Sequence, residues 1–184
     1  CLVGSEMCIR DRPMVIAAKK AKIKRFLYAS TSSVYGVSSK KDVTEDHPLV
    51  PLTLYNKYKG MCEPLLLKHT DKNFKGVVFR PATVCGYAPR LRLDLSVNIL
   101  TNFAINKSFI KVFGGDQLRP NLHIHDYFRA VETLITASDE KIENQIFNVG
   151  YQNLSISDLA QKVKSVVEKE FPEKKNIEIV KSPS

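Results

Sequence analysis

Residues 25–36 read RFLYASTSSVYG, an apolar run that passes directly into a cluster of hydroxyl residues. The apolar part, Arg25 to Ser30, is short and continuous, as expected for a strand buried on both faces of a parallel sheet. Hydroxyl groups at the carboxyl end of such a strand lie where open α/β sheets bind ligands. The segment therefore predicts both the fold class and the place of a functional site.

Helices and strands are predicted to alternate on both sides of this segment. Helices are expected over residues 14–24, 54–69, 96–105, 127–138 and 157–171, and further strands over residues 76–80, 109–113, 122–125, 145–149 and 176–180. Thr53 precedes the second helix, where a threonine hydroxyl can accept a hydrogen bond from the first turn. This alternation predicts an α/β fold with a largely parallel sheet.

The bulk composition is that of a globular domain with anionic partners. The 184 residues are enough for a core, 43% of them are apolar, and the formal charge is +9. The basic residues are scattered, with one dense group at residues 19–25, and do not alternate with aromatics as in a nucleic-acid binder. We therefore expect no nucleic-acid partner. Neither a membrane-spanning run nor a signal-peptide pattern is found, so we also expect no membrane partner.

The four cysteines, Cys1, Cys8, Cys62 and Cys85, form no CxxC pair. We interpret them as free thiols in a reducing compartment, the cytoplasm.

The opening stretch, CLVGSEMCIRDR over residues 1–12, has no helical or strand period. It resembles translated sequencing-adapter read-through, and we expect a non-native leader; the alternative is a genuine loop. The native part then starts at about residue 13.

A second informative segment, YNKYK, occupies residues 55–59. Tyr55 and Lys59 are four residues apart and share one face of the predicted helix. Tyr58 is a competitor, but no lysine stands four residues after it. A nearby ammonium stabilises a phenolate and lowers its pKa from about 10, so this tyrosine can exchange a proton with a sugar hydroxyl. The Thr31 hydroxyl would hydrogen-bond the same substrate oxygen.

Four segments together, STSSVYG, YNKYK, FRPATVCGY and RPNLHIHDY, resemble the NAD-dependent epimerase/dehydratase branch of the short-chain dehydrogenase/reductase superfamily. The resemblance runs from about residue 13 to 184. It implies the C-terminal part of a Rossmann-like doubly wound parallel sheet plus a small substrate-binding subdomain. The Rossmann portion would cover about 13–90 and 120–150, and the substrate-binding portion about 91–119 and 151–184.

The resemblance also implies roles for individual residues. Thr31, Tyr55 and Lys59 would form the catalytic set, with Ser30, Tyr55, Lys59 and Pro81 at the cofactor and Ser32, Ser33, Arg80 and Arg119 at the substrate. The guanidinium of Arg119 suits a nucleotide diphosphate, although a surface arginine is the alternative. A homodimer through the helix of Tyr55 and Lys59 is a further implication.

Two departures from the family pattern refine this interpretation. Sugar 4,6-dehydratases of the family usually carry Asp-Glu after the catalytic threonine, where this chain has Ser32 and Ser33; simple dehydration is therefore disfavoured, and the hydroxyl pair resembles 4-epimerases and keto-sugar reductases. Pro64 lies inside the predicted helix, which we expect to kink there. His123, His125 and Asp126 invite a metal site, but structural histidines are favoured and no metal is expected.

The chain's eight glycines form neither GxGxxG nor GxxGxxG, the turn that holds a dinucleotide's pyrophosphate. We expect a truncated family member that uses NAD or NADP, lacks that loop, and neither folds well nor turns over substrate alone. The expected function is NAD(P)-dependent epimerisation of a nucleotide sugar through Thr31, Tyr55 and Lys59. The alternatives are a keto-sugar reductase with the same residues and a non-catalytic nucleotide-binding relative.

Overall fold

The computed structural model describes residues 5–38, 40 and 42–182, with side chains described from Arg12 onward, and separates into two compact units. Unit 1 contains the residues up to Ala82 together with Asp126–Val149, and unit 2 contains Thr83–His125 and the residues from Gly150 onward. The junctions between the two units thus fall after residues 82, 125 and 149. From the sequence they were expected near residues 90, 120 and 150.

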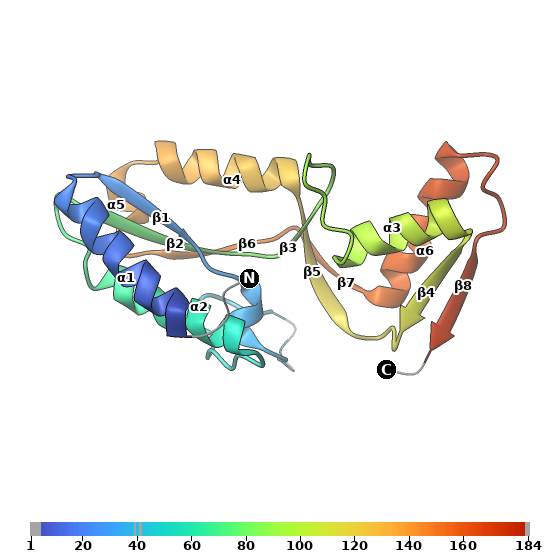
Figure 1. Cartoon of the computed structure of the whole chain (residues 1–184), viewed down its shortest axis with the longest axis horizontal. Coiled ribbons are helices and arrows are strands. Elements are labelled where there is room, and N and C mark those ends of the chain that lie inside the picture. Colours follow the sequence, from blue (N-terminus) through green and yellow to red (C-terminus); the bar gives the residue numbers. More distant parts are fainter. Residues whose placement is uncertain (1–4, 39, 41, 183–184) are drawn as a thin grey trace. The chain divides into compact units, whose positions relative to one another are not determined.

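The centre of unit 1 is a parallel sheet in the order β1-β2-β6 (Figure 1). Its strands are β1 (Arg25–Ala29), β2 (Lys75–Pro81) and β6 (Ile146–Val149). The predicted parallel α/β arrangement is confirmed, with Tyr28 paired to Val78 and Val78 paired to Ile146. β2 is the middle strand, and six of its seven residues are buried, which explains its nearly unbroken apolar sequence.

Helices cover both faces of this sheet. Successive residues of a strand point to opposite faces. Val78 accordingly packs in one cluster with residues of α1 (Ser5–Lys20) and α2 (Leu54–Leu67), and Val77 and Phe79 pack in another with residues of α4 (Ile124–Thr136) and α5 (Asp139–Ile142). The apolar side chains of β2 thus face two separate cores, as in a doubly wound fold.

Helix α2 follows its predicted course closely. The Thr53 hydroxyl accepts from Asn56 N at 3.2 Å, which confirms the expected cap. The helix continues as one element through the exposed Pro64 to Leu67. It packs closely on β2, since a Cβ on Gly76 would come within 2.9 Å of Leu66 Cγ.

Helix α1 differs from the sequence expectation. It begins at Ser5, whereas residues 1–12 were expected to lack regular structure and the helix to start at Met14. Residues 1–4 of the expected leader lie outside the described residues. Nothing in the described side chains explains the additional turns.

Unit 2 is built on two small sheets and a helix pair. One sheet has the order β3-β5-β7, with β3 (Thr83–Cys85), β5 (Leu118–His123) and β7 (Gln152–Ser155), and the other pairs β4 (Phe109–Phe113) with β8 (Glu178–Ser182). Helices α3 (Ser96–Lys107) and α6 (Ile156–Glu170) pack on β4 around Ile110 and Val112, both fully buried. Within the residues whose burial is described, this core shares no member with the two clusters of unit 1.

Four short elements, the 3-10 helix η1 (Ser32–Tyr35), β3, β7 and α5, were not predicted, and β5 was expected only over residues 122–125. β5 starts earlier because Leu118 to Asn121 pair antiparallel with β7. Its predicted end was wrong, since α4 begins at Ile124. Among the described residues, no helix is both long and apolar enough to cross a bilayer.

Candidate active site at the carboxyl end of β1

The hydroxyl cluster follows the last hydrogen bond of β1. Ser30 N donates to Phe79 O at 2.8 Å, which extends the pairing with β2 by one residue. The next residue, Thr31, has extended backbone and caps the short helix η1 (Ser32–Tyr35). Its Oγ1 accepts from Ser33 N at 3.2 Å, so the hydroxyl hydrogen is directed elsewhere and can be donated to a ligand.

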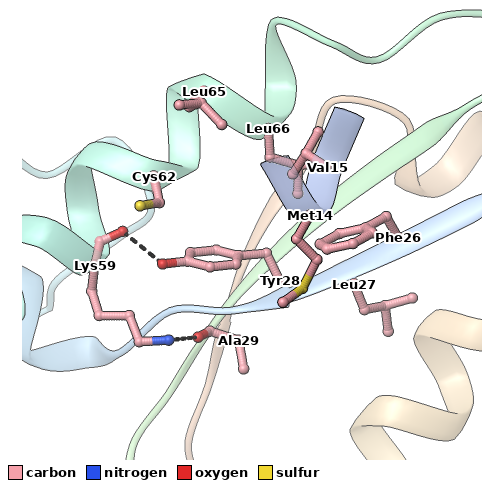
Figure 2. A pocket seen from close by; sticks show the side chains of 10 residues that line it. All are labelled: Met14, Val15, Phe26, Leu27, Tyr28, Ala29, Lys59, Cys62, Leu65 and Leu66. Carbon is pink, nitrogen blue, oxygen red and sulfur yellow. Dashed lines mark hydrogen bonds between the residues drawn. The ribbon is translucent and has the colours of Figure 1, made fainter. Parts of the chain in front are cut away.

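Lys59 is brought to the same strand end from α2. Its Nζ donates to Ala29 O at 2.7 Å and lies 4.8 Å from the centroid of the Tyr28 ring (Figure 2). The Tyr28 hydroxyl in turn donates to Lys59 O at 3.3 Å. The Lys59 ammonium is thereby bound to the carbonyl of Ala29, two residues before Thr31 in the sequence, although Lys59 and Ala29 are 30 residues apart.

Tyr55 lies one helical turn before Lys59, and Glu63 lies one turn after it. These three positions form a stripe along α2 that descends from solvent into the core. Tyr55 exposes 44% of its surface, Lys59 is half-buried, and Glu63 exposes 1%. The stripe therefore places a phenol at the surface, an ammonium at the strand end and a carboxylate inside unit 1.

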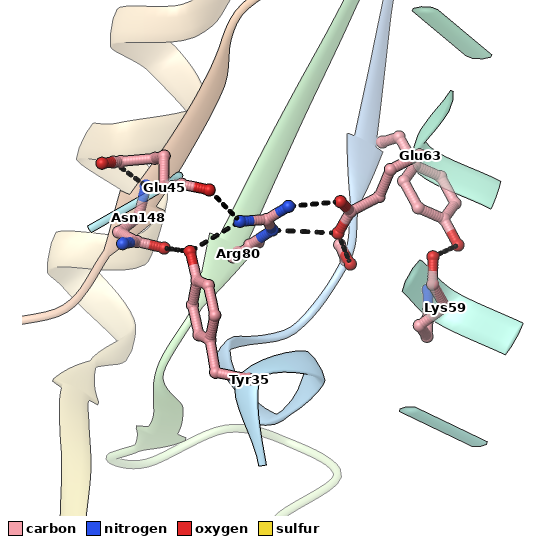
Figure 3. A network of polar contacts seen from close by, with 8 residues as sticks. Tyr35, Glu45, Lys59, Glu63, Arg80 and Asn148 are labelled. Carbon is pink, nitrogen blue, oxygen red and sulfur yellow. Dashed lines mark hydrogen bonds and ion pairs between the residues drawn. The ribbon is translucent and has the colours of Figure 1, made fainter. Parts of the chain in front are cut away.

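Glu63 forms a buried ion pair with Arg80 of β2 (Figure 3). Arg80 Nε donates to Glu63 Oε1 at 3.1 Å and Nη2 donates to Oε2 at 2.6 Å, a two-pronged contact. The Ser30 hydroxyl donates to Glu63 Oε1 at 2.5 Å. Burial alone would lower the pKa of Arg80, but its hydrogen bonds to Glu63 and Tyr35 and the nearby Glu63 charge outweigh burial and raise the pKa above its ordinary value.

The second branch of the network reaches η1 and β6. Arg80 Nη1 donates to the Tyr35 hydroxyl at 2.6 Å and to Glu45 O at 2.9 Å. The Tyr35 hydroxyl donates to Asn148 Oδ1 at 2.6 Å, and Asn148 N donates to Glu45 Oε1 at 2.7 Å. One guanidinium thus links β2 to α2, to the end of η1 and to the loop that precedes α2.

Two of the predicted site residues are bound to other protein groups. Ser30 was expected to contact the cofactor and Arg80 the substrate, but both side chains are buried and bind protein groups. The sequence reasoning also missed Glu63, Tyr35 and Asn148. A usable signal was present for Glu63, which stands four residues after Lys59 on the buried stripe of an otherwise apolar helix segment.

The remaining predicted residues lie as follows. Ser32 and Ser33 form the first turn of η1, with Ser33 exposed. Pro81 ends β2 in register with Val149. Arg119 belongs to unit 2, where it lies on β5 opposite Leu154 with its side chain exposed.

An apolar pocket lies beside this site, on the side of β1 that faces α1 and α2 (Figure 2). Its lining includes Met14, Phe26, Tyr28 and Leu66, and Lys59 is its charged member. His123 and His125 stack edge to face at 4.8 Å in unit 2. Across the part of the chain that the structure describes, no three His, Cys, Asp or Glu side chains gather as a metal site would require.

Comparison with known proteins identifies the family of this chain. Residues 10–150 match the NAD dependent epimerase/dehydratase family. The chain belongs to that family. Its relatives in the epimerase/dehydratase family include the UDP-glucose 4-epimerase of Lactobacillus helveticus, 28% identical over 82% of this chain and 52% of the relative. They also include the human dTDP-D-glucose 4,6-dehydratase, 27% identical over 82% of this chain and 42% of the relative.

The fold agrees with solved members of the epimerase/dehydratase family. The UDP-glucuronic acid 4-epimerase of Bacillus cereus, solved in complex with NAD, superimposes with a TM-score of 0.77 and 27% identity over 94% of this chain and 54% of that protein. The chain thus spans about half the length of the family members named here. The two relatives named here are a UDP-sugar epimerase and a dTDP-sugar dehydratase, and the solved structure is a UDP-sugar epimerase in complex with NAD.

Proposed function

We propose that the complete protein is an NAD(P)-dependent epimerase acting on a nucleotide sugar, with Thr31, Tyr55 and Lys59 as its catalytic residues. The observation that carries the proposal is the position of Lys59. Its ammonium is anchored on Ala29 O at the carboxyl end of β1, one helical turn from Tyr55 and two residues before Thr31. Ligands of open α/β sheets bind at this end of the strands.

The residues present suit the nicotinamide end of a dinucleotide. An ammonium and hydroxyl groups at the ends of β1 and η1 can hydrogen-bond ribose hydroxyls, and Pro81 at the end of β2 offers an apolar edge for a ring. When bound, the dinucleotide supplies hydride uptake from a sugar carbon and hydride return to it. We assign Lys59 and Tyr55 to the ribose contact and Pro81 to the ring contact.

Tyr55 is the proton carrier in this proposal. The Lys59 ammonium favours its phenolate, which takes the proton of the sugar hydroxyl as the carbon is oxidised and gives it back as the carbon is reduced. Thr31 donates its remaining hydrogen to the same sugar oxygen, since its acceptor site is used by Ser33 N. Tyr55 exposes 44% of its surface, which suits a residue that contacts a substrate.

The residues after Thr31 favour epimerisation over water elimination. Ser32 and Ser33 carry no carboxyl group, so the η1 turn offers neither a general acid nor a general base for removing a hydroxyl from a neighbouring carbon. Arg119 is proposed to bind the diphosphate of the nucleotide, and NAD and NADP both remain candidates for the cofactor. A homodimer through α2 belongs to the same proposal.

The test uses the complete gene product and a panel of UDP- and dTDP-sugars with NAD or NADP. An epimerase converts one sugar into its 4-epimer with no net change in cofactor absorbance, whereas a keto-sugar reductase consumes reduced cofactor in proportion to product. Tyr55→Phe removes the proton carrier, so we expect kcat to fall by about 10²- to 10⁴-fold.

Tyr58→Phe is the matched control, because Tyr58 is the other tyrosine of the same helix turn and lacks a lysine four residues later. Its kcat should stay within about threefold of the wild-type value. The assignment fails if both variants keep activity, or if the wild-type protein modifies none of the sugars and binds no dinucleotide.

A further inference from the structure

We infer that the buried Glu63–Arg80 pair is a positioning device that fixes Thr31 between two clamps. The pair touches no substrate in this inference and acts through the segment that carries Thr31. The inference rests on the proposed function, because it concerns how the proposed hydroxyl residue is held. It assigns a role to Glu63, Arg80, Ser30 and Tyr35 that the proposed catalytic set does not include.

The first clamp holds the residues that precede Thr31. Lys59 binds Ala29 O and Glu63 binds the Ser30 hydroxyl, so two successive turns of α2 hold the last residue of β1 and the residue that follows it. The Ser30 contact is 2.5 Å long and lies in the interior, where a hydrogen bond to a carboxylate is strong. The helix that carries Tyr55 and Lys59 is thereby set in register with the strand end.

The second clamp holds the residues that follow Thr31. Tyr35 is the last residue of η1, is 6% exposed, and accepts a hydrogen bond from Arg80 Nη1 at 2.6 Å. Since Arg80 also binds Glu63 with two nitrogens, both clamps meet on one ion pair. Thr31 thus lies between two held residues, one residue after Ser30 and four residues before Tyr35.

Stability alone is a poor explanation for this arrangement. Burying two charges costs free energy that their attraction barely repays, and well-packed apolar residues often replace such pairs without loss of stability. The network instead connects β1, η1, α2, β2 and β6 at the strand ends where the proposed chemistry takes place. A device for orientation accounts for both the burial and the location.

The experiment compares two double variants of the complete enzyme. Glu63→Leu with Arg80→Met removes the pair at the carboxyl end of β2 without leaving an unpaired charge. Glu143→Leu with Lys75→Met removes a second ion pair of the same strand, at its amino end, where Lys75 Nζ lies 2.7 Å from Glu143 Oε1. The measurements are Tm, kcat, KM and amide hydrogen exchange of residues 29–36.

We expect the Glu63/Arg80 variant to fold with a Tm near that of the wild type and to lose about 10²-fold in kcat, with KM changed far less, because misplacement by about 1 Å costs that much. Its amides at residues 29–36 should exchange faster. The Glu143/Lys75 variant should keep kcat and the exchange of residues 29–36, whatever it does to Tm. A merely structural role predicts that both variants alter Tm alone.

Several results would overturn the inference. One is a folded Glu63/Arg80 variant with wild-type kcat and unchanged exchange at residues 29–36. If that variant does not fold, Ser30→Ala and Tyr35→Phe are measured instead, because each removes the hydroxyl of one clamp. Unchanged kcat and unchanged exchange in both of these variants would also overturn the inference. If the wild-type enzyme proves inactive, the proposed function fails, while the exchange measurement still decides whether the pair holds this segment.

Discussion

The Thr31 hydroxyl caps η1, and we propose that it also donates a hydrogen bond to the substrate. Its Oγ1 accepts from Ser33 N, and its hydrogen is left for donation. Thr31→Val keeps the size of the side chain and removes both functions. We expect kcat to fall by about 10²-fold, the scale for losing one donor to a developing charge.

Thr31→Ser provides the control for that experiment, because serine retains both the cap and the donor. Its kcat should stay within about threefold of the wild-type value, measured on the same sugar. Equal losses in the two variants would mean that the methyl group of Thr31, and not its hydroxyl, matters.

A second residue-scale prediction concerns the link between α1 and the end of α2. Lys19 Nζ donates to His69 O at 2.7 Å and pairs with Asp71 Oδ2 at 2.6 Å. The hydrogen bond from Lys19, followed by that from Asn73 N, lowers the pKa of Asp71 below its ordinary value of 3.8. A carboxyl group with a lowered pKa stabilises the fold above pH 3.8, and that contribution is lost as the pH falls through its pKa in the folded state.

Lys19→Met should therefore raise the pKa of Asp71 toward 3.8, as followed by NMR titration of its carboxyl carbon. Lys20→Met is the control, since Lys20 is the exposed neighbour on α1 and has the same charge. An identical shift in both variants would show that overall charge, and not the Lys19 hydrogen bond, sets the value.

At the scale of elements, Arg25 joins the start of β1 to the end of α4. Its Nη1 donates to Leu134 O at 2.9 Å and to Ile135 O, and Nη2 pairs with Asp139 Oδ1 at 2.6 Å. These contacts satisfy carbonyls of the last turn of α4, which have no partner within the helix.

Arg25→Met should destabilise the protein by about 1–2 kcal/mol in urea unfolding, because carbonyls hydrogen-bonded to a cation lose their donor. Arg129→Met on the same helix is the matched control. Its ion pair with Asp126 is 3.7 Å long and its side chain is 80% exposed, so the expected change is below about 0.5 kcal/mol. Similar losses in the two variants would argue against a capping role for Arg25.

The elements differ in how well the sequence predicted them. β1, β2 and α2 were predicted to within about two residues, because a continuous apolar run and a threonine cap are local signals. β3 and β7 were missed, since strands of three and four residues depend on distant partners that no local pattern reveals. The same reason explains the early start of β5, whose first half pairs with β7.

The candidate site shows the same division. The helical spacing of Tyr55 and Lys59 and the hydroxyl cluster at the end of β1 were visible in the sequence. The buried roles of Ser30 and Arg80 were not, because they depend on Glu63 lying between them in space. The family resemblance implied a substrate contact for Arg80, and no local pattern indicated that its side chain is buried.

At the scale of the whole molecule, the described apolar clusters of unit 1 and of unit 2 share no buried residue. The cluster around Ile110 in unit 2 draws its buried members from α3, β4, α6 and Ile177, which lies just before β8. Ile110 is fully buried. Ile110→Ala should cost about 2–5 kcal/mol and should accelerate amide exchange in unit 2 more than in unit 1, because local opening follows the core that is weakened.

Val166→Ala is the control for that prediction, since Val166 lies on α6 in the same unit and exposes 57% of its surface. It should change stability by less than about 0.5 kcal/mol. Equal acceleration of exchange in both units after Ile110→Ala would mean that the two cores unfold as one.

The Glu63–Arg80 pair also bears on how this polypeptide could be divided. The segment between α2 and β2 includes a tight turn from Asp71 to Phe74, and a cut there would put the carboxylate in one piece and the guanidinium in the other. Each piece alone would face a lone charge in its interior, which is far costlier than the intact pair. In a two-piece version of the protein, folding would therefore depend on association, and neither fragment would fold until it binds the other.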